Sequence, residues 1–318
     1  MELTDSKMIY IIGGAKTGYN LYKFIKNIGV DVELYFFSQE FSQKRNIGKL
    51  YEHHWKGVKY LKSNDLLFVS SEKAFNNLMP EDYAYFKTHY FLRDKSNLHE
   101  ISTNINTTYI EEIDINDSEF PLIVKPKESS SSKVPFKILK VNNSEELRTI
   151  EDLLKYCFVQ PYLSDDKYSQ IAVAGYFDGK SSSLIAVEQK KQYPKGISAY
   201  VVDRTANYKC CIDSICKYLN KLAYTGFIEF EFKKNKETNE LYLMDINPRT
   251  WGWSYYYFDG IKNFRDVLFK GAFAEIKIKK SWINLPRLIL ASFKGEIILP
   301  SILDVVKKKV CYEPYFKK

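Results

Sequence analysis

Acidic and amide side chains gather on two short apolar segments in the second half of the chain. Side chains alternate along a strand, so in residues 229–232 both glutamates face one side and both phenylalanines the other. Asp245 and Asn247 share one face of the next apolar segment in the same way. The polar turn at residues 234–239 predicts that the two strands pair as a hairpin. Such a hairpin brings Glu231, Asp245 and Asn247 toward one point.

The residue types on this face suit a magnesium site. Two carboxylates and an amide oxygen are hard oxygen ligands of the kind that Mg²⁺ binds, and Arg249 adds a planar guanidinium that matches phosphate or carboxylate. The simpler interpretation is an amphipathic hairpin with one solvated acidic face. Pro248 ends the strand directly after Asn247, and an aromatic stretch with Trp251 and Trp253 follows. Charged groups beside such an apolar stretch favour a ligand-binding site.

The opening of the chain predicts a strand-helix-strand unit in front of this hairpin. Residues 8–12 form an apolar run that ends at two glycines, residues 20–28 have helical spacing, and residues 30–37 form a second strand. The turn at residues 13–18 matches neither the dinucleotide nor the Walker A fingerprint. Two interpretations stay open, a tight turn that needs glycine, or a helix N-terminus that faces an anionic substrate group.

The pattern changes to α+β with antiparallel strands beyond residue 90. A serine-rich loop separates the first two strands of this part, and a helix with an N-cap at Ser144 follows them. Near the end of the chain, an amphipathic helix is expected to pack on the main body. The expected strands cover residues 123–125, 136–141, 158–160, 171–177, 184–188, 227–232 and 240–246, and the last helix covers residues 285–293.

Composition and charge exclude several classes of protein. The 318 residues carry a net charge of +8, but the basic residues are scattered, so we expect no nucleic-acid partner. The five cysteines form no C-x-x-C pair, and Cys157 and Cys216 are expected to be buried. No stretch reaches the roughly 18 apolar residues of a membrane span, and residues 8–12 are too short for a signal peptide. We therefore expect a reduced, cytoplasmic protein without a membrane partner.

The run Asp245-Ile246-Asn247-Pro248-Arg249 resembles the metal-binding signature of the ATP-grasp superfamily, normally E-x-N-P-R, preceded by Glu or Gln on the partner strand. The separation of 14 residues between Glu231 and Asp245 is similar to that in the carbamoyl-phosphate synthetase branch. The resemblance implies that Glu231, Asp245 and Asn247 hold two Mg²⁺ ions, with Mn²⁺ as an alternative. It also implies that Arg249 contacts the transferred phosphate and the acyl intermediate.

Other segments resemble the same superfamily in the expected order. Arg93-Asp94-Lys95 resembles the start of the ATP-binding half, and Val124-Lys125-Pro126 resembles a strand whose lysine contacts the nucleotide phosphates. Residues 158–163 resemble the hinge that binds adenine, and the loop at residues 127–133 would cover the phosphates. The implied ATP-binding residues are Lys95 and Lys125, Ser130 and Ser131, Gln160, Pro161, Tyr162 and Leu163, with Asp166 or its neighbour Asp165 at the ribose.

A narrower likeness involves the loop that follows Glu188. Residues 188–196 together with the run Asn247-Pro248-Arg249-Thr250-Trp251-Gly252 resemble a bacterial group that includes D-aspartate ligase. In that group a basic-Gln-aromatic-Pro loop precedes N-P-R-x-W-G, which would make Lys191 a catalytic cation near the phosphates or the acid substrate. A solvated lysine-rich loop is the alternative, and both interpretations stay open.

Three residue choices depart from the superfamily pattern. Asp245 stands where Glu is usual, and its shorter side chain puts bidentate bridging of two metals in question. The phosphate-covering loop is serine-rich instead of glycine-rich, so its backbone approaches phosphate less freely. Pro161 removes one hinge N–H and keeps the carbonyl.

The resemblance implies an α/β domain followed by an α+β domain, that is, a Rossmann-like pre-ATP-grasp domain and a two-lobed ATP-grasp domain. The expected reaction is ATP-dependent ligation of a small-molecule carboxylic acid, an amino acid among the candidates, to an amine. A kinase on the same scaffold and a non-catalytic nucleotide-binding protein are the alternatives, and a homodimer is left open. The expected boundaries are 1–90 for the first domain, 91–163 for the small lobe, 164–275 for the large lobe and 276–318 for a C-terminal extension.

Overall fold

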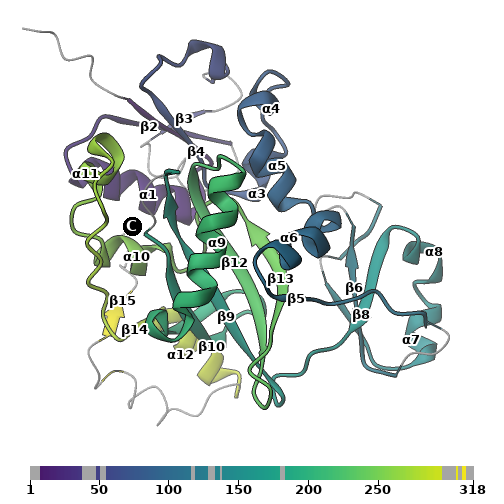
Figure 1. Cartoon of the computed structure of the whole chain (residues 1–318). Coiled ribbons are helices and arrows are strands. Elements are labelled where there is room, and N and C mark those ends of the chain that lie inside the picture. The colour runs from purple at the N-terminus through teal and green to yellow at the C-terminus, as the bar shows by residue number, and fades with distance from the viewer. Residues whose placement is uncertain are drawn as a thin grey trace, which may run out of the picture.

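The chain folds into three sheets with helices packed around them (Figure 1). A parallel sheet of four strands, a mixed sheet of eight strands and an antiparallel sheet of three strands account for the described strands. The α/β start followed by an α+β remainder agrees with the predicted fold class. The computed structural model describes residues 8–37, 48–50, 55–115, 119–127, 133–136, 138–179, 183–295, 306 and 310–312.

The first sheet is parallel and contains the predicted strand-helix-strand unit. The helix begins at Lys16, four residues before its predicted start, because Lys16 to Gly18 carry no apolar periodicity. Leu21 and Ile25 are fully buried and attach the helix to the sheet. The strand order is β3-β2-β1-β4, with β1 at Ile9–Ile12, α1 at Lys16–Asn27, β2 at Val32–Phe36, β3 at Lys49–Leu50 and β4 at Leu66–Val69.

The glycine turn between β1 and α1 has a packing reason. Gly13 adopts a φ of 109°, which favours glycine. A Cβ added to Gly18 would lie 1.9 Å from the carbonyl oxygen of Gly13, so the chain passes too close for any side chain. The first interpretation of the turn, a tight crossing that needs glycine, is therefore supported, and an anion at the helix N-terminus stays a prediction.

Short helices lead from β4 to the large sheet. The helix α5 crosses residue 90, where the sequence places a domain boundary, and the next helix packs on the large sheet through Leu98 and Ile101. The strand β5 then pairs in parallel with β13 of that sheet. The elements are α3 at Glu72–Phe75, α4 at Asp82–Tyr85, α5 at Lys87–Arg93, α6 at Leu98–Asn104 and β5 at Thr108–Tyr109, with 3₁₀ turns at Val58–Tyr60 and Lys95–Asn97.

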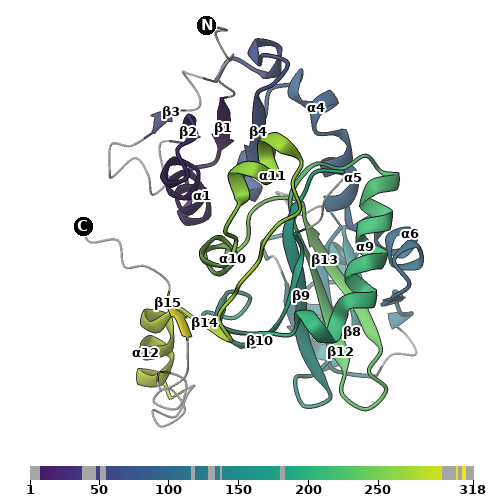
Figure 2. The ribbon, with the colours of Figure 1, turned by 60° about the vertical axis from the view of Figure 1, so that its left-hand side comes forward.

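The large sheet carries a core on each of its faces. Alternate residues of β9 face opposite sides, Ala172 and Ala174 toward α1 and α10, and Ile171 and Val173 toward α6 and α9. Figure 2 shows α9 and α10 on opposite sides of the sheet. The bounds are β9 at Tyr168–Phe177, β10 at Ile185–Gln192, β11 at Ser198–Asp203, α9 at Lys209–Lys221, β12 at Gly226–Asn235, β13 at Leu241–Asn247, α10 at Ser254–Gly260 and α11 at Phe264–Lys270, with a 3₁₀ turn at Thr205–Tyr208.

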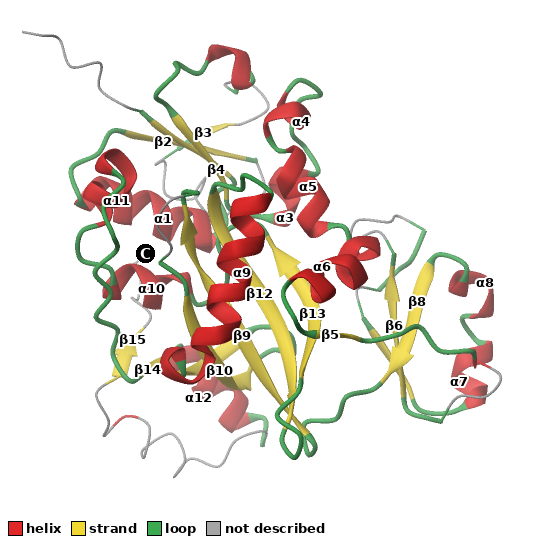
Figure 3. Cartoon of the chain, in the orientation of Figure 1, coloured by secondary structure: helices red, strands yellow, loops and turns green. Residues whose placement is uncertain are grey.

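The three-stranded sheet lies to one side of the large sheet with its own small core (Figure 3). Its central strand is β6, which is antiparallel to both neighbours. The predicted cap at Ser144 is wrong by one residue, because the Asn143 side chain accepts a hydrogen bond from the Glu146 N–H at 2.9 Å. The bounds are β6 at Leu122–Pro126, β7 at Leu139–Val141, α7 at Ser144–Arg148, α8 at Glu151–Leu154 and β8 at Cys157–Pro161.

The described C-terminal part contains the predicted helix and two strands that the sequence analysis missed. Helix α12 covers Leu285–Phe293, while β14 (Ser281–Ile283) and β15 (Val310–Tyr312) extend the large sheet beyond β11. These strands are too short for a recognisable alternation. Cys157 is buried as expected, but Cys216 is only half-buried. Among the described residues, no helix combines the length and the apolarity that a membrane crossing requires.

Candidate functional site

The site forms on the hairpin of β12 and β13, which lies toward the β5 edge of the large sheet. Glu229 lies opposite Asn247, and Glu231 lies opposite Asp245, with an irregularity in the register after Glu231. Phe230 and Phe232 are fully buried on the other face and their rings stack. The predicted hairpin is therefore confirmed, and it places the three predicted metal ligands on one face of the sheet.

Asn247 connects the acidic residues to Arg249. Its side-chain amide donates to Glu229 Oε2 and to Glu231 Oε1, both at 3.2 Å. Its Oδ1 accepts a hydrogen bond from a terminal nitrogen of Arg249 at 2.7 Å. On the other side, the Gln170 amide on β9 donates to Glu231 Oε2 at 3.3 Å. Glu231 is thus held from two neighbouring strands.

Glu229 belongs to this cluster, although the sequence analysis named it only as a neighbour on the same face. It is 4 % exposed, and the Trp253 indole N–H donates to its Oε1 at 3.0 Å. Burial, and then the negative charge of Glu231, raises the pKa of Glu229 well above its usual range. The signal that was available in the sequence is the spacing of two residues from Glu231, which puts both side chains on one face.

Two lysines come from outside the large sheet and lie near these carboxylates. Burial, and then the positive charge of Lys95, lowers the pKa of Lys125 to about 8, while Asp245 acts in the opposite direction. Burial and then Asp245 raise the pKa of Glu231 to about 7, against the opposing charges of Arg249 and Lys95. Lys125 on β6, Lys95 before α6 and the hairpin are therefore close enough to influence one another's charge.

The donor set of the cluster fits a divalent cation. Burial and then the negative charge of Asp245 raise the pKa of Glu231, and a cation between the two carboxylates would favour their charged forms. Within the described residues, no three His, Cys, Asp or Glu side chains group as metal ligands. Mg²⁺ commonly takes one or two carboxylates and completes its shell with water and substrate phosphate oxygens. Two carboxylates and the Asn247 amide match that mode of binding.

Arg249 is fixed on several sides by the chain. Besides its bond to Asn247, it donates to the carbonyl oxygen of Thr250 at 2.9 Å, and its Nε lies 3.6 Å from Glu72 Oε2. The buried Thr250 hydroxyl donates to the carbonyl oxygen of Ser70 at 3.3 Å. The predicted phosphate-binding arginine therefore stands where the hairpin meets the end of β4.

The predicted adenine hinge follows β8. The buried Gln160 side chain donates to the carbonyl oxygen of Ile110 at 2.5 Å, so its amide supports the hinge internally. The Tyr162 N–H donates to the carbonyl oxygen of Pro121 at 3.1 Å, and Pro161 has no N–H. A contact between the hinge backbone and an adenine edge stays a prediction.

The remaining predicted residues lie at the edges of the site. Lys233 Nζ lies 2.5 Å from Asp165 Oδ1, and Asp166 or its neighbour Asp165 stays the predicted ribose acid. Lys191 is exposed on β10 at an irregular point of its register with β11. Ser130 and Ser131 lie outside the described residues. The roles of all of these residues remain predictions.

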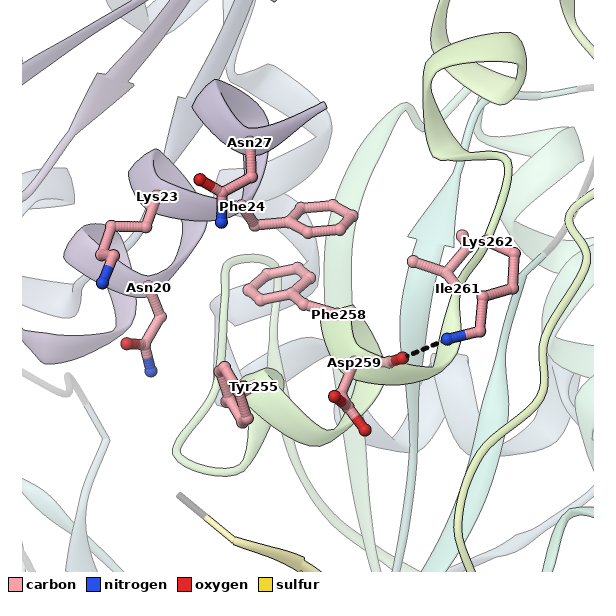
Figure 4. Close-up of a pocket in the computed structure, with 9 residues that line it drawn as sticks. All are labelled: Asn20, Lys23, Phe24, Asn27, Tyr255, Phe258, Asp259, Ile261 and Lys262. Atoms are coloured by element: carbon pink, nitrogen blue, oxygen red, sulfur yellow. Dashed lines mark hydrogen bonds between the residues drawn. The ribbon is translucent and has the colours of Figure 1, made fainter. Parts of the chain in front are cut away.

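Two clefts in the described part of the chain lie apart from this cluster. The first has a volume of about 340 Å³ between α1 and α10, where Phe24 stacks on Phe258 at 4.7 Å between ring centroids (Figure 4). The second has a volume of about 380 Å³ beside Tyr10, Tyr35 and Trp55. No predicted site residue lines either cleft, so the clefts do not mark the predicted chemistry.

The mixed α/β fold with three sheets is consistent with the ATP-grasp resemblance. No family model and no curated protein sequence matches the chain. Among solved structures, N5-carboxyaminoimidazole synthetase from Staphylococcus aureus is similar at 17% identity and a TM-score of 0.66, over 91% of this chain and 85% of that chain.

Two further solved structures have the same fold. The L-amino acid ligase from Bacillus licheniformis is similar at 13% identity and a TM-score of 0.57, over 86% of this chain and 78% of that chain. N5-carboxyaminoimidazole synthase from Aspergillus clavatus, in complex with ADP and 5-aminoimidazole ribonucleotide, is similar at 14% identity and a TM-score of 0.55, over 80% and 73%. These likenesses confirm that the chain shares the fold of the solved structures, in agreement with the predicted resemblance.

Proposed function

We propose that this protein is an ATP-dependent carboxylate-amine ligase. It activates a substrate carboxylate as an acyl phosphate, joins it to an amine, and releases ADP and phosphate. The observation that carries this proposal is the convergence of Lys95 and Lys125 with Glu231, Asp245 and Asn247, since it combines phosphate-binding and metal-binding groups. The fold supports it, because the similar structures include an L-amino acid ligase and a synthase with bound ADP.

The lysines would bind the nucleotide phosphates. Burial lowers the pKa of Lys125 to about 8, and a neighbouring phosphate would raise that pKa and favour the charged form. Mg²⁺ or Mn²⁺, with two ions expected, would be held by Glu231, Asp245 and Asn247 and would offset charge on the transferred phosphate. The hinge backbone around Leu163 would fix the adenine, so the γ-phosphate would be presented toward the hairpin.

Arg249 would act on the substrate in both steps. Its guanidinium is oriented by Asn247 and Thr250 before any substrate arrives, so little reorganisation is needed during the reaction. It would stabilise the carboxylate as it attacks the γ-phosphate, and then the oxyanion that forms when the amine attacks the acyl phosphate. Catalysis would rest on positioning and electrostatics, and no nucleophilic side chain is required.

The substrates are a small carboxylic acid and an amine, and a screen can identify them. The protein is incubated with Mg-ATP and pairs of amino acids or amines, ADP and phosphate release are measured, and products are analysed by mass spectrometry. A ligase releases ADP only when both partners are present and forms a condensed product. Complete ADP formation without an amine, together with a phosphorylated acceptor, would favour the kinase alternative.

The proposed reaction does not depend on a cytoplasmic location or on a homodimer. The sequence predicts the location and leaves the homodimer open. Cell fractionation tests the first and sedimentation velocity of the purified protein tests the second.

A further inference from the structure

Glu72 lies between two arginines at the end of the parallel sheet. It is the first residue of α3, directly after Ser71, whose side chain caps the helix by accepting the Ala74 N–H at 3.1 Å. One carboxylate oxygen of Glu72 lies 3.6 Å from Arg249 Nε, and the other pairs with a terminal nitrogen of Arg93. The capped turn after β4 therefore presents a single carboxylate to two guanidiniums.

The Glu72 carboxylate approaches the one edge of Arg249 that the hairpin leaves open. One terminal nitrogen of Arg249 donates to Asn247 Oδ1 and the other to the Thr250 carbonyl. Arg249 Nε is buried and has no hydrogen-bond partner in the described part of the chain. Glu72 is the only acid that pairs with Arg249 among the described residues. Two hydrogen bonds and an ionic contact at Nε leave a planar guanidinium fewer orientations than the two hydrogen bonds alone.

Arg93 holds Glu72 in turn. The Arg93 guanidinium lies 5.1 Å from the centroid of the Phe75 ring and donates to Asn76 Oδ1 at 2.9 Å. Its side chain is 14% exposed, so the pair with Glu72 is partly shielded from solvent. Arg93 is also two residues before Lys95, a predicted phosphate ligand. Ion pairs thus connect Arg93, through Glu72, to Arg249.

We propose that Glu72 is a positioning residue for Arg249, which sets the guanidinium at the angle that the transferred phosphate and the acyl group require. This inference rests on the proposed function. Glu72 acts through Arg249 and takes no part in nucleotide binding. Replacing its charge would let the Nε edge of Arg249 turn while the bonds to Asn247 and Thr250 persist.

The kinetic test compares E72Q with E81Q in the full chain. Glu81 is a matched control because it is a half-exposed glutamate of the same region that pairs with Lys59 at 3.5 Å, away from the hairpin. With Mg-ATP and a substrate pair from the screen, E72Q should lower kcat by roughly tenfold, with the KM for ATP unchanged within about twofold. E72D should recover part of the loss, and E81Q should match the wild type.

A double variant tests whether the effect passes through Arg249. R249K should lower kcat more than E72Q, and E72Q combined with R249K should be no slower than R249K alone. Additive losses in the double variant, or equal kcat for E72Q and E81Q, would overturn the positioning role. The positioning role would also be overturned if E72Q lost thermal stability in proportion to its loss of kcat and E72D recovered no activity. Both results would point to a purely structural residue.

A spectroscopic readout separates this inference from the proposed function. In ¹⁵N-labelled protein, the Arg249 Nε–H signal is assigned by its loss in R249K. E72Q should shift that signal and E81Q should leave it in place, with or without ligase activity. A wild type that forms no product in the screen contradicts the proposed function alone, whereas an unshifted signal in E72Q contradicts the contact on which the positioning role depends.

Discussion

At the scale of single residues, the site depends on carboxylates that are held close together. Glu229, Glu231 and Asp245 share one sheet face, and hydrogen bonds from Asn247, Gln170 and Trp253 hold two of them. Asp245 is one methylene shorter than the glutamate that is usual in the signature. It lies directly opposite Glu231 in the register, so the two carboxylates still face each other across the hairpin.

Removing the charge of Asp245 should strongly lower turnover. D245N keeps the shape of the side chain but leaves Glu231 as the only charged member of the proposed ligand set, so we expect kcat to fall by about two to three orders of magnitude. Mg-dependent ADP release measures the effect. The control is D266N, at a half-exposed aspartate that pairs with Lys270 on α11. Wild-type activity in D245N would refute the metal assignment.

The pH dependence of stability should show the raised pKa of Glu231. Its folded pKa of about 7 lies above the ordinary value of 4.5, so the folded protein binds the proton more tightly than the unfolded chain does. The contribution of Glu231 to stability is therefore fully present below about pH 4.5 and is lost as the pH rises through about 7. Without metal, the free energy of unfolding should fall by about 1–3 kcal/mol through this window.

The variant E231Q tests the source of that loss. Denaturant unfolding in EDTA at pH 5 and pH 8 should give a smaller difference for E231Q than for the wild type. E237Q, at an exposed glutamate in the hairpin turn, should retain the wild-type difference. A pH difference that survives in E231Q would show that Glu231 is not the titrating group.

At the scale of elements, the hairpin is anchored by the segment that leads into α10. Trp251 and Trp253 are both fully buried, but only Trp253 donates to the cluster, since the indole nitrogen of Trp251 has no hydrogen-bond partner among the described residues. The two tryptophans therefore differ in polar contact and resemble each other in burial.

W253F and W251F form a matched pair for measuring that anchor. Both lose packing, but W253F also deprives the buried Glu229 of a donor, so it should be less stable than W251F by about 1–2 kcal/mol at neutral pH. Chemical denaturation of the two variants measures the difference. Equal losses, or a larger loss in W251F, would mean that the indole bond to Glu229 adds no stability.

Local sequence patterns were enough to predict individual strands and helices. Contacts between segments that lie far apart in the sequence could not be predicted from such patterns. Alternation of Glu and Phe revealed the β12–β13 hairpin, and glycine followed by helical spacing revealed β1 and α1. The strands β5, β14 and β15 are only two or three residues long, too short for a period. The Arg249–Glu72 pair joins segments from different sheets, and no local pattern marks such a contact.

At the scale of the whole molecule, three sheets bring separate chemical groups to one place. The small sheet supplies Lys125, the large sheet supplies the acidic hairpin, and the end of the parallel sheet supplies Glu72 behind Arg249. This arrangement explains why the predicted residues lie far apart in the sequence. The solved structures that share this fold have identities of 13–17% to the chain.

The most direct test of the proposed function follows oxygen atoms. The carboxylic acid found in the screen is labelled with ¹⁸O in its carboxylate, and the released phosphate is analysed by mass spectrometry. If the carboxylate attacks the γ-phosphate and the amine then displaces phosphate, each released phosphate carries one ¹⁸O atom from the acid. Unlabelled phosphate, released at the same rate with or without the amine, would contradict activation through an acyl phosphate.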